Sequence, residues 1–175
     1  MTIESVLKKN IDSYCSRNEI SLSDNQINKL IDLFSSTKDE NNRKLIVNRG
    51  KNRKLDGKNS CWDEDVSFEW EIFSIYIYVE LCAGNCFSAH FHFKAMIDDV
   101  PVAERDYTVD CNEPSIGWTF DIIGQLYVEV GVRGHNTCAF TLGYLSVPIL
   151  GKVLEWDENI ICFSRNTANQ PRFVQ

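Results

Sequence analysis

The sequence predicts an α+β fold, in which two N-terminal helices precede a mainly antiparallel β-sheet. Apolar residues recur at helical spacing in the first 35 residues. From residue 66 onward they alternate with polar residues, which is typical of strands with one buried face. A β-sandwich or partly open barrel with an N-terminal helical hairpin is the alternative. The length of 175 residues favours a single domain with one core.

Two helices are predicted, at 3–17 and 24–35, and together they make a helical hairpin at 1–35. Thr2 is suited to cap the first helix. Ser23 and Gln26 form a capping-box pattern at the start of the second. The apolar stripe of each helix is expected to pack in the core.

A basic stretch, 43–58, follows a polar loop at 35–42 and holds seven Lys and Arg against one Asp. We expect a solvated loop or an edge hairpin whose charges deter aggregation. An arm that contacts phosphate groups is the alternative, but the stretch lacks the interleaved aromatic residues that single-stranded nucleic acid requires.

The antiparallel β core is expected at 62–163, around a hairpin formed by residues 73–82 and 87–97. A three-residue loop, 83–85, would pair Leu81 with Phe87 and place the apolar side chains of both strands on one face. The apolar phase changes from even to odd at Ile72–Phe73, which indicates a β-bulge or a bend.

Further strands are expected on both sides of Gly124, which marks a bend or a hairpin. A three-residue loop at 134–136 would pair Val132 with Cys138. Residues 153–163 give one more strand, which is expected to be broken at 157–159, and the polar tail 164–175 is expected to be loose.

Seven cysteines occur without a recurring spacing. The N-terminus is too polar for an export signal, and no apolar run is long enough to cross a membrane. We therefore predict a cytoplasmic protein whose cysteines are reduced. Cys82 and Cys86 flank the 83–85 loop and could pair, although two free thiols are favoured there.

No nucleotide-binding or hydrolase motif is present, so we assign no catalytic residue, cofactor or metal and do not expect an enzyme. His90 and His92 share one strand face, and the predicted register places them opposite Tyr78 and Tyr76. Such a pair can ligate a metal if a third ligand converges. The candidates for that ligand are Glu80, Cys82, Cys86 and His135. Cross-strand packing of tyrosine and histidine on a half-exposed face is favoured over ligation.

Basic and acidic residues are distributed unevenly along the chain. Residues 1–60 hold twelve Lys and Arg against eight Asp and Glu, whereas residues 61–175 hold six against seventeen. An acidic β core disfavours nucleic acid as a partner and suits a basic protein. We predict that acidic residues, with Trp62 and Trp156 as exposed aromatic anchors, bind that partner. The acidic candidates are Asp63, Glu64, Asp65, Asp98, Asp99, Glu104, Asp106, Asp157 and Glu158.

In its size, its acidity and its lack of enzyme motifs, the chain resembles the immunity proteins of bacterial polymorphic or contact-dependent toxin systems. The resemblance is one of class and rests on no motif. It implies a cytosolic protein that blocks a basic toxin, most plausibly a nuclease. The runner-up is a small-ligand-binding β-barrel or sandwich whose pocket is lined by Tyr76, Tyr78, His90 and His92. A metal-dependent enzyme that uses the His90/His92 face is the third hypothesis.

Overall fold

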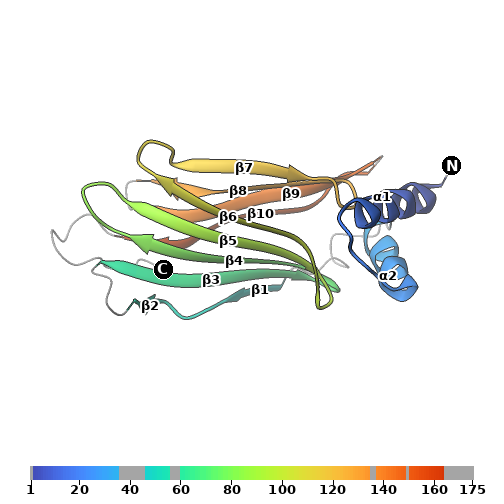
Figure 1. Cartoon of the computed structure of the whole chain (residues 1–175), viewed down its shortest axis with the longest axis horizontal. Coiled ribbons are helices and arrows are strands. Elements are labelled where there is room, and N and C mark those ends of the chain that lie inside the picture. The colour runs from blue at the N-terminus through green and yellow to red at the C-terminus, as the bar shows by residue number, and fades with distance from the viewer. Residues whose placement is uncertain (1, 36–45, 56–59, 135–136, 149, 164–175) are drawn as a thin grey trace.

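The computed structural model describes residues 2–35, 46–55, 60–134, 137–148 and 150–163. Two helices are followed by two antiparallel sheets, which confirms the α+β class. The sheets face each other as two layers, so the sandwich alternative describes their arrangement (Figure 1). The loop at 36–42, the ends of the basic stretch at 43–45 and 56–58, the turn residues 135 and 136 and the tail 164–175 lie outside the described residues.

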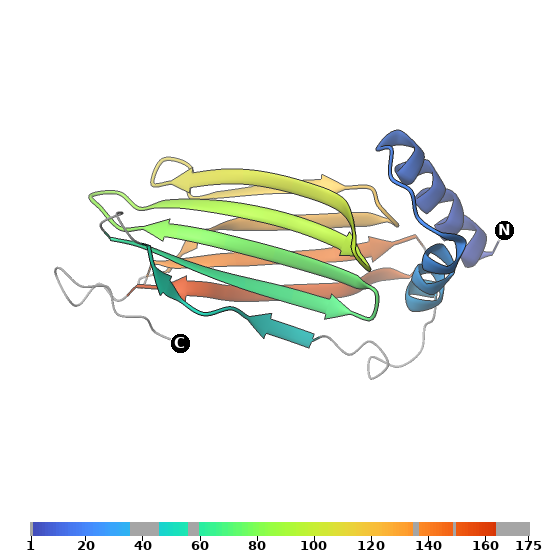
Figure 2. The ribbon, with the colours of Figure 1, turned by 60° about the horizontal axis from the view of Figure 1, so that its bottom comes forward.

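The helices α1 (Ile3–Arg17) and α2 (Asp24–Ser35) have the predicted bounds. The Thr2 hydroxyl oxygen accepts a hydrogen bond from the Ser5 backbone nitrogen at 3.2 Å. Both bonds of the Ser23–Gln26 capping box form, at 2.9 and 3.1 Å. The two helices pack against one end of the sandwich (Figures 1 and 2).

The larger sheet, sheet A, has the strand order β1-β3-β4-β5-β6, and β2 also pairs with β3. Its strands are β1 (Ile46–Arg49), β2 (Arg53–Lys54), β3 (Cys61–Trp70), β4 (Phe73–Cys82), β5 (Ser88–Ile97) and β6 (Val100–Asp110). The described part of the basic stretch thus forms two short strands at the edge of sheet A.

The smaller sheet, sheet B, has the order β10-β9-β8-β7. Its strands are β7 (Ser115–Phe120), β8 (Gln125–Arg133), β9 (Cys138–Val147) and β10 (Gly151–Cys162). Aromatic rings from both sheets fill the space between them. For example, the Phe68 and Trp156 ring centroids lie 5.7 Å apart, and those of Phe93 and Phe120 lie 5.5 Å apart.

The phase change at Ile72–Phe73 marks a tight turn between two long strands, where a bulge or bend was predicted. Trp70 pairs directly with Phe73, and Glu71 adopts a positive φ of 51° in the turn between them. A two-residue turn pairs an even position with an odd one. The apolar phase must therefore change across it if both strands are to keep one buried face.

The register of the β4–β5 hairpin differs from the prediction by two residues. Leu81 pairs with Ala89, where Phe87 was expected, and Cys82 pairs with Ser88. His90 therefore lies opposite Glu80, and His92 lies opposite Tyr78. A shift of two residues keeps the same side chains on the buried face, so the alternation in the sequence does not distinguish the two registers.

The register of the β8–β9 hairpin differs from the prediction by one residue. The side chains of β9 that were predicted to point inward therefore point outward, and the reverse. Val132 pairs with Ala139, where Cys138 was expected. Thr141 is fully buried. A Cβ on Gly143 would meet the Trp156 indole at 2.3 Å, so this glycine leaves the room that the indole occupies. From Ala139 to Gly143, the interior side of β9 is thus made of small residues beside the large Trp156 ring.

All cysteines except Cys15 form disulfides, so the prediction of reduced thiols is wrong. The pairs are Cys61–Cys82, Cys86–Cys111 and Cys138–Cys162. The predicted alternative, Cys82 with Cys86, is not formed. Five of the six paired cysteines lie at a strand end or one residue beyond it, and Cys86 lies in the β4–β5 turn, so all three bridges lie at the end of the sandwich opposite the helices (Figure 1). Neither of the described helices has the length and apolar character needed to cross a membrane.

Candidate functional site

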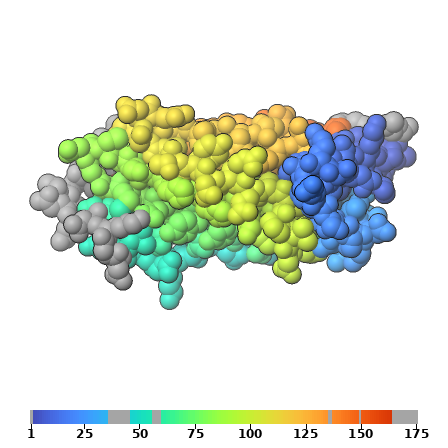
Figure 3. Space-filling view, viewed as in Figure 1, coloured from blue at the N-terminus to red at the C-terminus, as the bar shows by residue number. Residues whose placement is uncertain are grey.

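The two described helices leave the outward side of sheet A uncovered, because both pack at one end of the sandwich (Figures 2 and 3). We call the outward positions of β3 to β6 the outer face. They are Asp63, Asp65, Ser67 and Glu69; Ser74, Tyr76, Tyr78 and Glu80; Ser88, His90, His92 and Lys94; and Glu104, Asp106, Thr108 and Asp110. The runner-up residues Tyr76, Tyr78, His90 and His92 therefore do share one surface.

The outer face is acidic. Seven of its positions are carboxylates and one, Lys94, is a lysine. The side chains of Glu104 and Asp106 are 52% and 60% exposed, so their charges reach solvent. The field of this face therefore attracts cationic groups.

Histidines from β5 and carboxylates from β6 form a cluster on this face. The His92 Nδ1 and Asp106 Oδ1 atoms are 2.9 Å apart, and the His92 Nε2 and Glu104 Oε1 atoms are 3.1 Å apart. His90 Nε2 lies 3.5 Å from the same Asp106 oxygen. The sequence suggested the histidines and the carboxylates for different roles. It did not indicate this contact, because their pairing depends on a bulge between Ala95 and Met96.

A second cluster surrounds Asp63, whose side chain is 4% exposed. The Arg53 guanidinium donates to both carboxylate oxygens, at 3.1 and 3.2 Å, and the Tyr78 hydroxyl donates to Oδ2 at 2.9 Å. Burial, followed by this hydrogen bond to Asp63, raises the pKa of Tyr78 to about 12. The carboxylate is thus neutralised within the chain and is a poor anchor for a partner.

A cleft of about 350 Å³ opens beside Tyr78 and is also lined by Tyr76, Asp65 and Lys51. The backbone of Gly50 approaches Asp65 so closely that a Cβ there would overlap the carboxylate. The edge segment between β1 and β2 therefore forms one wall of the cleft. This tyrosine-lined cleft is the nearest counterpart in the structure to the predicted ligand pocket.

The other predicted acidic residues do not join the outer face. Glu64 lies on the inward side of β3, opposite Val79, and burial raises the pKa of its carboxyl group. Asp98 and Asp99 lie in the β5–β6 turn, where the Gln26 amide donates to Asp98 at 3.2 Å. On β10, Asp157 pairs with Arg133 and Glu158 with Arg49, at 2.6 and 2.8 Å. The predicted set therefore divides into at least three separate regions.

The prediction of Trp62 and Trp156 as exposed anchors is wrong. Trp156 is 4% exposed, and its indole nitrogen donates to the Thr141 hydroxyl at 3.1 Å. Trp62 is 7% exposed and lies against Phe163. The apolar alternation of Leu154 and Trp156 along β10 was the available signal of burial.

The disulfides remove two of the candidate metal ligands, because Cys82 and Cys86 are both oxidised. Within the described residues, one group of three potential ligands has its donor atoms within 4.8 Å of one another. It consists of Cys61, Glu80 and Cys82, whose two sulfur atoms already form a disulfide. Of the two remaining candidates, Glu80 lies opposite His90 on β4, and His135 lies outside the described residues.

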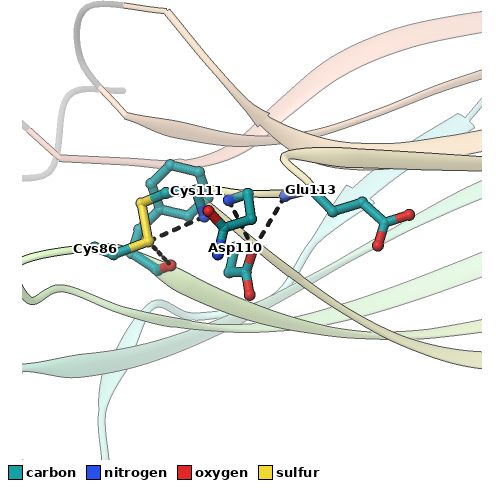
Figure 4. Close-up of a disulfide and its surroundings, with 6 residues drawn as sticks. Cys86, Asp110, Cys111 and Glu113 are labelled. Atoms are coloured by element: carbon teal, nitrogen blue, oxygen red, sulfur yellow. Dashed lines mark hydrogen bonds between the residues drawn. A yellow bond between two sulfur atoms is a disulfide. The ribbon is translucent and has the colours of Figure 1, made fainter.

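The Cys86–Cys111 bridge joins the β4–β5 turn to the segment after β6 (Figure 4). There the Asp110 carboxylate accepts hydrogen bonds from the backbone nitrogens of Asn112 and Glu113, at 2.8 and 3.0 Å. This Asx turn and the bridge fix the end of β6 relative to β5. The outer face is consequently a firmly held surface at this end.

Comparison with known proteins found no relative of the chain, because no family model, no curated protein and no solved structure matches it.

Proposed function

We propose that the chain is a binding protein that neutralises a basic protein partner, and that the partner docks on the outer face of sheet A. The outward side of sheet A has seven carboxylates against Lys94 and Arg53, and Arg53 is paired with Asp63; this excess of negative charge carries the proposal. Such a face accelerates encounter with a cationic surface and disfavours anionic competitors. An immunity protein that blocks a toxin has this requirement and needs no catalytic group.

Among the predicted partner-binding residues, we favour those on this face that no arginine of the chain neutralises. Glu104 and Asp106 are the leading pair, because their side chains are 52% and 60% exposed and their carboxylates contact His92, which is a weaker partner than an arginine. Asp63, Asp157 and Glu158 are already paired with arginines of the same chain. The free energy needed to break those ion pairs would offset part of the binding free energy that a partner's cation contributes.

The disulfides change the compartment that we propose. The cytoplasmic prediction depended on reduced cysteines, whereas disulfides persist in oxidising compartments. Three bridges in 175 residues favour a protein that works outside the reducing cytosol. A partner met there need not be a nuclease, so the proposal extends to basic toxins and other basic proteins.

The test is a pull-down at low salt with three baits: the wild-type chain, Glu104→Gln/Asp106→Asn and Asp98→Asn/Asp99→Asn. Both double variants remove two charges, but only the first changes the outer face. We expect a stoichiometric basic protein on the wild type and on the second variant, released by salt and lost from the first variant. Equal capture by all three baits would contradict docking on this face.

A second candidate function, small-ligand binding, is supported by the cleft beside Tyr76 and Tyr78. Its walls hold three carboxylates and two tyrosines against Lys51 and Arg53, and because Arg53 is paired with Asp63, this excess of negative charge suits an amine or guanidinium compound. Spermidine and agmatine are suitable probes, and Tyr78→Phe and Asp65→Asn are the variants that should weaken binding. Binding of neither compound at millimolar concentration would remove the support for this candidate.

A further inference from the structure

Two of the three disulfides are shielded by the sandwich. Cys61–Cys82 and Cys138–Cys162 each join directly opposed positions of neighbouring strands. Cys61, Cys138 and Cys162 are 6%, 8% and 9% exposed, and Cys82 is half-buried. The Glu80 carboxylate lies 3.9 Å from the Cys82 sulfur, where its charge would repel an approaching thiolate. A thiol in solution is therefore kept away from both of these bridges.

The third bridge, Cys86–Cys111, is open to solvent. Both of its cysteines are exposed. Both also lie outside the strands, because the bridge joins the β4–β5 turn to the segment after β6 (Figure 4). Exchange begins when a thiolate reaches one of the two sulfur atoms of a disulfide, so exposure favours reaction at this bridge.

Hydrogen bonding distinguishes the two sulfur atoms of the bridge. The Cys111 backbone nitrogen donates to Cys86 Sγ at 3.0 Å (Figure 4). Such a donor stabilises the negative charge that develops on Cys86 Sγ when the S–S bond breaks. The Phe87 carbonyl oxygen lies 3.4 Å from the same sulfur and is placed to accept a hydrogen bond from the thiol that forms afterwards. Cys86 is therefore the better leaving sulfur, and Cys111 is the one that is attacked.

We propose that the Cys86–Cys111 bridge is a site of thiol–disulfide exchange with a small thiol, whereas the other two bridges are structural. The thiolate forms an S–S bond with Cys111 Sγ, and the bond between the two cysteines breaks. Its electron pair leaves on Cys86 Sγ, which takes a proton from water. A second thiolate then attacks the sulfur of the bound thiol and releases Cys111 as a thiolate. The bridge gains two electrons, and two thiols are oxidised to one disulfide.

The surroundings of the bridge select the kind of thiol. Asp110 precedes Cys111 in the sequence, Glu113 follows it, and the chain has a net charge of −7. A cationic thiol should therefore react faster than an anionic one. The pairing of Ser88 with Asp110 and the Asx turn at Asp110 do not include the bridge, so the strands should stay paired after exchange. Asp110 belongs to the outer face, and opening the bridge would loosen that end of it.

The test is incubation of the folded Cys15→Ser chain with increasing concentrations of cysteamine, a cationic thiol. Free thiols are then trapped with N-ethylmaleimide, and the modified cysteines are identified by peptide mass spectrometry. The substitution removes the free cysteine, which could otherwise exchange with the bridges. We expect maleimide on Cys86 and cysteamine on Cys111 at a concentration at least about tenfold below that which opens either other bridge.

The matched control is the same chain in concentrated urea, with its three bridges intact at the start. Unfolding exposes every bridge, so the difference in reactivity should disappear. A difference that persists in urea would show that local sequence sets the reactivity and would contradict the role of exposure.

Two results in the folded chain would also overturn the proposal. Opening of all three bridges at one cysteamine concentration would show that no bridge is a preferred site. Cysteamine found equally on Cys86 and Cys111 would contradict the assignment of Cys86 as the leaving sulfur. The exchange involves no protein partner, so its failure is distinct from failure of the proposed docking function.

Discussion

Removing the Cys86–Cys111 bridge should destabilise the chain mainly through its unfolded state. Both cysteines are exposed, so Cys86→Ser/Cys111→Ser leaves no cavity. The bridge closes a loop between residues 25 positions apart. The chain-entropy relation then gives a loss of about 3.5 kcal/mol in the free energy of unfolding. This loss is a large share of the stability of an ordinary domain.

Urea unfolding without reductant is the assay. With a urea slope of about 2 kcal/mol per molar, the midpoint should fall by about 1.75 M. Cys15→Ser is the control, because it removes the one cysteine that closes no loop. A thiol titration in denaturant should find one thiol before reduction and seven after it, as the chain holds seven cysteines and three bridges. An unchanged midpoint, or seven thiols before reduction, would refute the reasoning.

Three further predictions concern the core at β9 and the outer face of sheet A. Thr141→Val leaves the buried indole nitrogen of Trp156 without its acceptor, so thermal unfolding should show a loss of about 1–3 kcal/mol, and an unchanged midpoint would contradict the hydrogen bond. Gly143→Ala places a Cβ 2.4 Å from the Tyr127 carbonyl oxygen and should cost about 1–3 kcal/mol, whereas a gain in stability would show that β9 has a different register. Because the pKa of Tyr78 is raised to about 12, its contribution to stability should be intact below pH 10 and lost as the pH rises toward 12. Tyr78→Phe should therefore show a shallower loss of unfolding free energy over that range, and equal slopes would contradict the raised pKa.

The helices could be predicted because their signals are local. The apolar stripe and the capping residues Thr2, Ser23 and Gln26 lie within one or two turns of the backbone that they fix. The strands were equally visible as alternating runs. Both kinds of element depend on contacts between near neighbours in sequence.

The strand registers could not be predicted with the same success, because they depend on contacts with residues that are distant in the sequence. A one-residue change in the β8–β9 pairing follows from the indole of Trp156, a residue of β10 that lies over Gly143. The disulfides likewise join cysteines 21 to 25 positions apart, a relation that spacing alone does not indicate.

The candidate site was predicted in its parts but not as a whole. The tyrosine–histidine face followed from strand alternation, and the structure places those residues together. The contact of Asp106 with both histidines required the pairing of β5 with β6 and its bulge, which the sequence does not reveal. Trp156 was misplaced because acidic neighbours on both sides suggested a loop.

We propose that the outer face of sheet A recruits a basic protein. The most direct measurement is the association rate of the basic partner recovered in the pull-down, followed across a range of salt concentrations. For Glu104→Gln/Asp106→Asn we predict association about tenfold slower at low salt and a weaker salt dependence, with Asp98→Asn/Asp99→Asn close to wild type. Equal rates and equal salt dependence for the two double variants would contradict the claim.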